Sequence, residues 1–466
     1  MKFVVQPATR PLGGTIIIPG DKSIGHRSLL FSLLSTKPIR VSGLGDGADN
    51  GRSAKAITAL GAKVERDGDT LVITGTGLDG MSASTNPIDC GNSGTTIRLL
   101  CGLLAGQKFE TTLVGDESLS KRPMKRVIEP LARMGATITG TKRGGGGSPF
   151  KGAGNSGAMS LSEVTDVTPP LVVGPAGMLD AIDYVLPMAS AQVKTAVLLA
   201  GLSANGVTTV TEPGPSRDHS ERMLAYLGAP LTVSGRTTTI DTRGWNRVLA
   251  PKDDGGFVVP ADPSSSAFLV AAALVAGATE VRLPNVCINP TRTGFLDAIA
   301  SMGGVVELTN VRDAGPEQVA DLVVRGPARG LRATEIAGDL SVRSIDELPI
   351  LAVLAARAEG ITTVRDADEL RVKESDRVET TCAMLRAFGI QAESRPDGFV
   401  VHGTGGKPFS PGRVHADGDH RIAMAAVIAG LVATGESIID DADNVVTSYP
   451  GFAAAMTQLG ASVSQA

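Results

Sequence analysis

The chain has 466 residues, of which 42% are hydrophobic and 20% are charged, and its formal net charge is -4. This length exceeds what one hydrophobic core normally serves, so we expect two globular domains. The slightly acidic balance and an aromatic content of 3% give no basis for nucleic-acid binding by bulk charge or by base stacking.

The ends, apolar runs and cysteines of the chain argue against secretion and against a membrane. The N-terminal sequence MKFVVQPATRPLGG lacks the long apolar core of a signal peptide. The longest apolar runs, such as the one from Ile422, are too short to cross a bilayer. We therefore expect a cytoplasmic protein that binds neither nucleic acid nor membrane. The cysteines form no CxxC pair and predict reduced thiols in or near the core: Cys90, Cys101, Cys287 and Cys382.

Six segments repeat one short motif around a glycine. Each motif is typical of a helix end, a glycine cap in the left-handed conformation, and the start of a strand. Successive glycines lie roughly 70 to 95 residues apart, which is longer than solenoid repeats and requires several elements in each unit. The motifs are LGAKV at Gly61, MGATI at Gly135, LGAPL at Gly228, MGGVV at Gly303, FGIQA at Gly389 and LGASV at Gly460.

Each unit is predicted to contain a strand, a helix, a strand, a second helix and a two-stranded hairpin. In the first unit the hairpin is AKVERDGDTLVITG, with a turn at Asp67 and Gly68. Three units precede residue 257 and three follow it, which predicts two similar halves. In chain order the first helices begin in KSIGHRSLLFSLLS, NSGTTIRLLCGLLAG, SAQVKTAVLLAGL, SSSAFLVAAALVAGA, DELPILAVLAARAEG and DHRIAMAAVIAGLVATG.

Two glycine-rich segments are not interpreted as phosphate-binding loops. GTGLDG at residues 75–80 follows a predicted strand, but no helix follows it, so we interpret it as the exit of a hairpin. Residues 142–157, with the sequence KRGGGGSPFKGAGNSG, have the composition of a linker. We expect a mobile surface loop there, with an engineered linker as the alternative.

Polar and charged residues stand at the predicted helix starts of the first half. Lys22, Ser23 and Arg27 begin the first helix, where cations oppose the helix dipole and would be offset by an anionic ligand. Gly94 would let a ligand approach the backbone, and Arg122 could bind a carboxylate or phosphate through two hydrogen bonds. The alternatives are a solvated charged turn, an N-capped tight turn and a surface charge run, respectively.

The third unit continues this pattern, and so does the second half of the chain. Ser190 and Gln192 offer hydrogen-bonding groups at a helix start, and Arg217 follows in PSRDHSER. Asp346 lies directly before an apolar helix, where an ordinary N-cap is the alternative interpretation.

The last two units add the densest charge. RVKESDRVE contains Lys373, Glu374 and Arg377, which a solvated helix face would also explain, and GDHRIAM places His420 and Arg421 at a helix start. Because nearly every repeat presents unusual polar residues at the same end of the same element, we predict a shared cationic cleft. Such a cleft suits a substrate, or a pair of substrates, with several negative charges.

These motifs together resemble the 5-enolpyruvylshikimate-3-phosphate synthase (3-phosphoshikimate 1-carboxyvinyltransferase) family of enolpyruvyl transferases. The resemblance covers about residues 15–460 and rests on PGDKSIGHRS, GNSGTTIR, GDESLSKRPM, SAQVK, DPSSSAF, IDELPILAV, RVKESDR and DHRIAM, in that order. It implies an α/β, two-domain enolpyruvyl transferase fold, an inside-out α/β barrel, with three βαβαββ repeats around a pseudo-threefold axis in each domain. Residues 20–257 would form the domain on the shikimate 3-phosphate side, residues 1–19 and 258–466 the other, and the active site would lie in the interdomain cleft.

The resemblance also implies an activity. The enolpyruvyl group of phosphoenolpyruvate would be transferred to the 5-hydroxyl of shikimate 3-phosphate, with release of phosphate by addition and elimination, in chorismate and aromatic amino acid biosynthesis. The hydroxyl attacks C2 while C3 takes a proton, and then phosphate leaves and C3 loses a proton. No metal, nucleotide or covalent cofactor is implied. The protein would be a monomer that glyphosate inhibits by competing with phosphoenolpyruvate.

The site residues follow from the same resemblance, position by position. The implied catalytic residues are Lys22, which spans the hydroxyl and the leaving phosphate, Asp346, which partners the hydroxyl, and Glu374, which exchanges the proton at C3. The implied ligands of shikimate 3-phosphate are Lys22, Ser23, Arg27, Ser190, Ala191, Gln192, Arg217, Asp346 and Lys373. The implied ligands of phosphoenolpyruvate are Lys22, Gly94, Arg122, Gln192, Arg377, His420 and Arg421, with Glu374 and Asp419 nearby.

The chain departs from the family pattern at Gly25, where a side chain is common, and at Thr447, where enteric-type enzymes carry a lysine to phosphoenolpyruvate. One alternative is the sister transferase that acts on UDP-N-acetylglucosamine, but that enzyme usually carries a cysteine in the loop that reads GDESLSKRPM here. A non-catalytic anion-binding protein is the other alternative. The presence of Lys22, Asp346 and Glu374 argues against it.

Overall fold

The computed structural model describes residues 1–45, 47–142, 167–251, 256–326 and 330–465. Within these ranges the chain folds into two compact units. The inserted unit comprises Lys22–Val259, and the terminal unit comprises Met1–Asp21 together with Pro260–Ala466. Except for Lys142, the linker-like segment expected at residues 142–157 lies outside the described residues.

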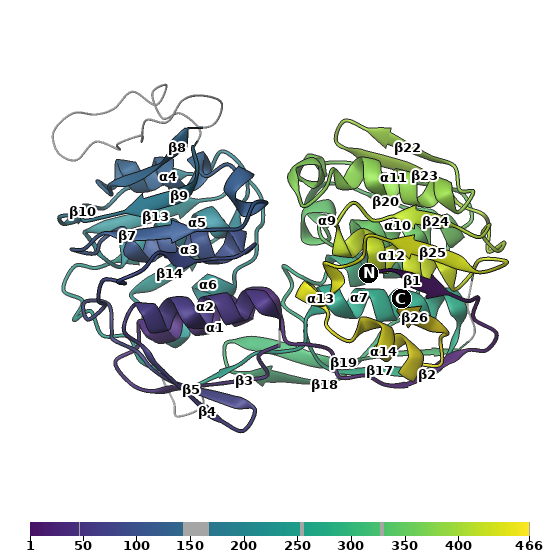
Figure 1. Cartoon of the computed structure of the whole chain (residues 1–466), viewed down its shortest axis with the longest axis horizontal. Helices are drawn as coiled ribbons and strands as arrows, with labels where there is room; N and C mark the ends of the chain where they lie inside the picture. Colours follow the sequence, from purple (N-terminus) through teal and green to yellow (C-terminus); the bar gives the residue numbers. More distant parts are fainter. Residues whose placement is uncertain (46, 143–166, 252–255, 327–329, 466) are drawn as a thin grey trace. The chain divides into compact units, whose positions relative to one another are not determined.

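The inserted unit contains three four-stranded sheets with one shared topology (Figure 1). In each sheet the first strand pairs parallel to the second, and the remaining pairs are antiparallel. The first strand of the first sheet comes from the far end of the unit, which closes the set of repeats. In sheet order the strands are β16 (Phe257–Val258), β3 (Ile39–Ser42), β5 (Thr70–Thr74) and β4 (Lys63–Asp67); β6 (Ile88–Asp89), β7 (Thr111–Val114), β9 (Val167–Val173) and β8 (Ile138–Lys142); and β11 (Asp183–Val185), β13 (Val207–Thr211), β15 (Thr237–Asp241) and β14 (Leu231–Ser234).

Each repeat of this unit contains two helices, one before and one after the second strand of its sheet, as predicted. Those at the centre of the unit are apolar on nearly every side, which is the pattern of a buried helix. A Cβ atom on Gly102 would lie 2.3 Å from the carbonyl oxygen of Ala196, so the third and fifth helices meet backbone to backbone. The helices are α1 (Lys22–Leu33), α2 (Ala48–Ala59), α3 (Gly94–Leu104), α4 (Lys125–Arg133), α5 (Ala191–Gly201) and α6 (His219–Tyr226).

The terminal unit repeats the same sheet topology three times. Its last sheet is completed by the N-terminal strand β1, which pairs antiparallel to strands on both sides. In sheet order the strands are β18 (Glu307–Ala314), β19 (Glu317–Gly326), β17 (Ala278–Cys287) and β2 (Leu12–Thr15); β20 (Glu335–Ile336), β21 (Ile361–Val364), β23 (Gly398–His402) and β22 (Ala392–Arg395); and β24 (Arg413–His415), β25 (Ser437–Asp440), β1 (Phe3–Val5) and β26 (Val463–Gln465).

Three buried helices, α7, α10 and α12, pack against one another in the core of this unit. Each is nearly uniformly apolar after its first turn, as expected for a helix that is buried on all sides. The α/β class and the three repeats per unit are thereby confirmed. The helices are α7 (Pro263–Ala276), α8 (Gly294–Ser301), α9 (Gly338–Arg343), α10 (Leu348–Arg357), α11 (Arg377–Ala387), α12 (His420–Gly430), α13 (Val445–Ser448) and α14 (Phe452–Gln458).

The predicted glycine caps are confirmed at all six positions. The backbone angle φ is positive at each, from 78° at Gly389 to 105° at Gly61. The residue after each glycine donates its N–H to the carbonyl five positions earlier, as Ala62 does to Ile57 at 3.0 Å. This is the Schellman arrangement, which satisfies carbonyls that the helix end leaves without partners.

The turn of the first hairpin lies one residue later than predicted. Asp67 pairs with Thr70, so the turn residues are Gly68 and Asp69 rather than Asp67 and Gly68. Gly68 takes the first turn position because its φ of 59° is accessible to glycine at little cost. Residues 75–80 follow β5 without opening a helix, which confirms the interpretation as a hairpin exit.

The four cysteines are buried and free, in agreement with the expectation of thiols in the core. Burial raises the pKa of the Cys382 thiol to about 11. Within the part of the chain that the structure describes, no helix combines the length and apolar character that a membrane span requires.

Candidate active site

The inserted unit holds its predicted anion-binding residues at the starts of its first helices. Lys22 is the first residue of α1, and its ammonium pairs with Asp49 of α2. Ser190 caps α5 by accepting a hydrogen bond from the Val193 N–H at 3.4 Å. Gly94 is the first residue of α3. Each of these helix starts carries partial positive charge from its free amides.

Two guanidinium groups flank Gly94. A Cβ atom at this position would lie 2.9 Å from Arg98 Nη1 and 3.3 Å from Arg122 Nη1. Arg98 also donates to the side-chain oxygen of Gln192 at 2.7 Å, and Gln192 donates to Thr95 Oγ1 at 3.0 Å. The starts of α3 and α5 are therefore joined by hydrogen bonds around a position that has no side chain.

Arg27 lies beneath the start of α1 instead of on its exposed face. Its side chain is buried and donates to the carbonyl of Ser23 at 2.9 Å and to Ser220 Oγ at 2.7 Å. It also donates to Thr195 Oγ1 at 3.3 Å, and Arg217 donates to Ser23 Oγ at 3.3 Å. Arg27 thus links α1, α5 and α6, and Arg217 extends from the loop before α6 to the same serine.

The terminal unit gathers its predicted residues around one buried guanidinium. The side chain of Arg377 is 1% exposed and meets three carboxylates. The distances are 2.8 Å to Asp419, 2.6 Å to Glu374 and 3.2 Å to Asp346. A solvated helix face is therefore the wrong interpretation for Arg377, because a buried charge of this kind is stable only when it is paired.

Asp346 also lies close to two further cations. Lys373 Nζ is 3.8 Å and Arg421 Nη2 is 3.7 Å from its carboxylate, and Arg421 donates to its backbone oxygen at 2.9 Å. Glu347, not Asp346, occupies the position before α10, and no side chain caps this helix. The alternative of an ordinary N-cap is therefore excluded for Asp346.

The electrostatics around Arg377 fix two protonation states. Burial would raise the pKa of Glu374, but the charges of Arg377 and Lys373 hold that pKa well below its usual range. Burial, aided by the Arg421 charge, lowers the pKa of His420 to about 4. At neutral pH Glu374 is therefore a carboxylate and His420 is an uncharged imidazole.

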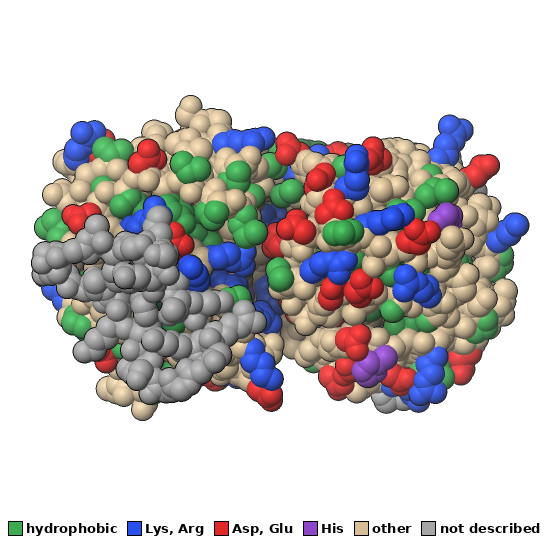
Figure 2. Space-filling model, turned by 90° about the horizontal axis from the view of Figure 1, so that it is seen from above, with side chains coloured by type: hydrophobic (Ala, Val, Ile, Leu, Met, Phe, Trp, Pro, Cys, Tyr) green, Lys and Arg blue, Asp and Glu red, His purple; other side chains and the backbone are tan. Residues whose placement is uncertain are grey.

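Figure 2 shows Lys and Arg side chains grouped on the surface of the inserted unit, whereas acidic and basic side chains alternate over the terminal unit. In the terminal unit each predicted cation has a carboxylate neighbour within about 4 Å, as the Arg377 cluster illustrates.

Two charged residues of these clusters were not among the predicted site residues. Arg98 could have been found, because it follows Gly94 by four positions and thus lies on the same helix face. Asp49 could not, because only the packing of α2 against α1 brings it to Lys22. The same packing accounts for Gly25, since a Cβ there would lie 2.6 Å from Asn50 Nδ2. Thr447 lies in α13 and donates to the carbonyl of Asn444 at 2.7 Å.

Known proteins resemble this chain over nearly its full length. The family model described as EPSP synthase (3-phosphoshikimate 1-carboxyvinyltransferase) matches residues 7–158 and 151–456. A protein of Geobacter sulfurreducens named 3-phosphoshikimate 1-carboxyvinyltransferase is 45% identical over 450 residues, which cover 97% of both chains. One of the same name from Geotalea uraniireducens is 44% identical over 458 residues, or 98% of this chain and 99% of that one.

A solved structure of EPSP synthase from Acinetobacter baumannii is similar over 100% of both chains, with a TM-score of 0.84 and 37% identity. An enolpyruvyl transferase of Streptomyces tendae shares the fold, with a TM-score of 0.73 at 19% identity, over 99% of this chain and 98% of that one. The full-length match to the family model, the relatives and the solved structure leads to one conclusion. This chain belongs to the EPSP synthase (3-phosphoshikimate 1-carboxyvinyltransferase) family.

Proposed function

We propose that this protein transfers the enolpyruvyl group of phosphoenolpyruvate to the 5-hydroxyl of shikimate 3-phosphate and releases phosphate. The observation that carries the proposal is the cluster around Arg377, where Glu374 and Asp346 are held as partners of one buried guanidinium. Together with Lys22, these are the residues for which the family match implies catalytic roles. The activity places the chain in chorismate and aromatic amino acid biosynthesis.

The inserted unit is proposed to bind shikimate 3-phosphate. The phosphate and carboxylate groups of this substrate would accept hydrogen bonds from Ser23, Ser190 and Arg217, which lie at or beside helix starts that favour anions. The further ligands are proposed to be Lys22, Arg27, Ala191 and Gln192 from this unit and Asp346 and Lys373 from the terminal unit. Because Arg27 is buried, its main contribution would be to hold the backbone of Ser23 in place.

Phosphoenolpyruvate is proposed to occupy the position beside Gly94. The guanidinium groups of Arg98 and Arg122 lie beside this position and would attract a small anion, and the glycine places no side chain in front of them. Lys22, Gln192, Arg377, His420 and Arg421 complete the proposed ligand set. His420 would bind as a neutral imidazole and could donate or accept one hydrogen bond.

The proposed chemistry begins when the 5-hydroxyl oxygen forms a bond to C2 and its proton passes toward Asp346. The C2–C3 double bond opens, and C3 takes a proton from Glu374. In the second step the C2–O bond to phosphate breaks, the leaving phosphate takes up the proton held by Asp346 while Lys22 stabilises its charge, and C3 returns a proton to Glu374. Two anionic substrates near Glu374 would raise its pKa from the depressed value of the free protein, so that it can serve first as acid and then as base.

We further propose that glyphosate competes with phosphoenolpyruvate, and that the protein acts as a monomer in the cytoplasm. The first proposal rests on the cationic surroundings of Gly94, which would accept the inhibitor's phosphonate as well as a phosphate. Sedimentation of the purified chain during turnover tests the second.

The function is tested by phosphate release from phosphoenolpyruvate with different acceptors. We expect release with shikimate 3-phosphate and none with UDP-N-acetylglucosamine or without an acceptor. The reverse preference would assign the chain to the sister activity. Tight binding of both substrates without any phosphate release would favour an anion-binding protein and contradict the proposal.

A further inference from the structure

Lys194 lies on α5 two residues after Gln192, but its ammonium points into the protein. Its side chain is 2% exposed, and Nζ lies 2.6 Å from both Glu212 Oε2 and Glu221 Oε1. The two carboxylates are themselves 9% and 6% exposed. A lysine is seldom buried so deeply, and two carboxylates around one ammonium form a fully enclosed ion triad.

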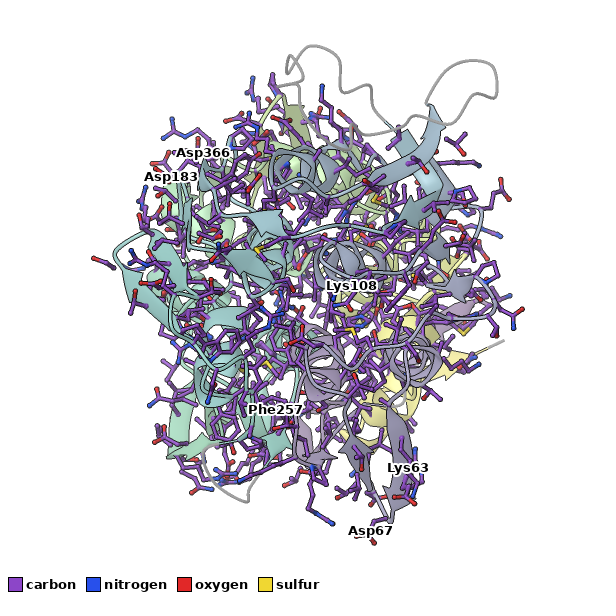
Figure 3. All side chains as sticks on the ribbon, turned by 90° about the vertical axis from the view of Figure 1, so that its left-hand side faces the viewer. Lys63, Asp67, Lys108, Asp183, Phe257 and Asp366 are labelled. Carbon is purple, nitrogen blue, oxygen red and sulfur yellow. The ribbon has the colours of Figure 1, made fainter. Side chains whose placement is uncertain are left out.

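The two glutamates mark the ends of one loop. Glu212 directly follows β13, and Glu221 lies in the first turn of α6, so residues 212–218 are held at both ends by the same ammonium. Within the loop, Ser216 donates to the second oxygen of Glu212. Asp183, which is labelled in Figure 3, lies on β11. This strand pairs parallel to β13, the strand that directly precedes the loop in the chain.

The loop carries Arg217, which donates to Ser23 Oγ at the start of α1. Directly after the loop, Ser220 accepts a hydrogen bond from Arg27 at 2.7 Å. Lys194 therefore connects two segments that are proposed to bind shikimate 3-phosphate. One is the start of α5, and the other is the loop with Arg217.

The charge of Lys194 cannot be replaced by an apolar group without cost. The triad already contains more negative than positive charge, and Glu221 Oε2 has no hydrogen-bond partner among the described residues. Burial raises the pKa of Glu221, in opposition to the neighbouring ammonium. Removal of the cation would leave two carboxylates buried without compensation, and they would move apart or admit water.

We propose that Lys194 is a positioning residue for shikimate 3-phosphate, because it fixes both ends of the Arg217 loop against the start of α5. The proposal rests on the proposed function. It predicts a larger effect on one substrate, because the loop carries Arg217, which donates to Ser23 Oγ, and both residues are proposed as ligands of shikimate 3-phosphate only. Loss of the ammonium should therefore weaken binding of shikimate 3-phosphate much more than binding of phosphoenolpyruvate.

The test compares three variants of the full chain by calorimetry with shikimate 3-phosphate and by steady-state kinetics. Lys194→Met should raise the Kd for shikimate 3-phosphate by about tenfold or more, which corresponds to about 1.4 kcal/mol, with KM for phosphoenolpyruvate within about twofold. Lys194→Arg keeps the charge and should recover most of the affinity. Leu198→Ala removes a buried side chain one turn later on the same helix; it should lower thermal stability without changing this Kd.

A further variant, Glu212→Ala, keeps the test valid if Lys194→Met does not fold. Glu212→Ala frees the start of the loop but leaves Lys194 paired one to one with Glu221, so the buried charge stays balanced. We expect it too to raise the Kd for shikimate 3-phosphate. Wild-type affinity in Glu212→Ala or in a folded Lys194→Met would overturn the proposal. Equal loss for both substrates, or a loss matched by Leu198→Ala, would reduce Lys194 to a structural residue. If wild type itself does not bind shikimate 3-phosphate, the proposed function fails.

Discussion

At the scale of single residues, the chemistry is concentrated in one buried guanidinium and its carboxylates. Arg377 keeps Glu374 ionised in the free protein and holds Asp346 beside it. A carboxylate with a strongly lowered pKa is a poor acid, so substrate binding has to change its surroundings before it can protonate C3. The free protein is thus prepared for the second half of the reaction, in which a base is needed.

Glu374→Gln tests this assignment. The amide preserves the shape and can still accept a hydrogen bond from Arg377, but it cannot exchange a proton. We expect turnover to fall about a hundredfold or more, with little change in binding of shikimate 3-phosphate. Glu379→Gln, on the exposed side of α11, is the matched control and should behave as wild type. Near-normal turnover of Glu374→Gln would move proton transfer to another residue.

Gly94→Ala tests the proposed site of phosphoenolpyruvate and of glyphosate. The added methyl group would lie 2.9 Å from Arg98 Nη1, so this guanidinium must shift and the space beside it shrinks. A clash of about 1 to 3 kcal/mol acts most on the longer ligand. We expect the inhibition constant of glyphosate to rise by about tenfold or more, and KM for phosphoenolpyruvate by a smaller factor. Equal inhibition constants for wild type and variant would show that Gly94 does not line the site.

At the scale of elements, the glycine caps set where each second helix stops and the hairpin begins. Gly228 has a φ of 80°, and a Cβ atom there would meet nothing within 4 Å, so its role is conformational alone. Five other helices end in the same way, which makes the six repeats directly comparable.

Gly228→Ala measures how much the left-handed glycine contributes to the free energy of unfolding, and Gly51→Ala is its control. We expect Gly228→Ala to lower the free energy of unfolding of the inserted unit by about 1 to 2 kcal/mol, the cost of a left-handed alanine. Gly51 lies inside α2 with open space around it, so the same substitution there should stabilise the unit by about 0.5 to 1 kcal/mol. Denaturant midpoints of the two variants measure the difference. A shift of the same sign in both would contradict the account of the caps.

The elements were largely predictable from the sequence because each repeat carries its own local signals. The caps at Gly61 and its equivalents, the apolar first helices and the hairpins all depend on residues within one repeat. Charge partners on different elements were not predictable in this way. Nothing local marks the pairing of Lys22 with Asp49 or of Lys194 with Glu212 and Glu221, because tertiary packing alone brings these charges together.

A second buried cluster of charges in the terminal unit, around Arg292, illustrates the same limit. Arg292 pairs with Asp21 at 2.6 Å and with Asp262 at 3.2 Å, and these aspartates stand where the chain leaves and re-enters this unit. Charges at helix starts stand out in the sequence, whereas no local pattern distinguishes Arg292 from a surface arginine. Burial, which only the fold reveals, is what distinguishes it.

At the scale of the whole molecule, the proposed reaction needs groups from both units at one pair of substrates. Lys22 belongs to the inserted unit, and Asp346 and Glu374 to the terminal unit. We therefore expect shikimate 3-phosphate to make the protein more compact, because the ligand gives the two units a common partner. Small-angle scattering with and without saturating ligand measures the radius of gyration. An unchanged radius would indicate that binding of this substrate does not bring the units together.

The most direct test of the central claim is the reaction carried out in D₂O and followed by proton NMR. If the chain acts by addition and elimination, C3 becomes a methyl group in the intermediate before it loses a proton. We therefore expect the enolpyruvyl product on shikimate 3-phosphate to carry deuterium at C3, with one phosphate released for each product formed. Product without deuterium, or phosphate without the transferred enolpyruvyl group, would contradict the proposed function.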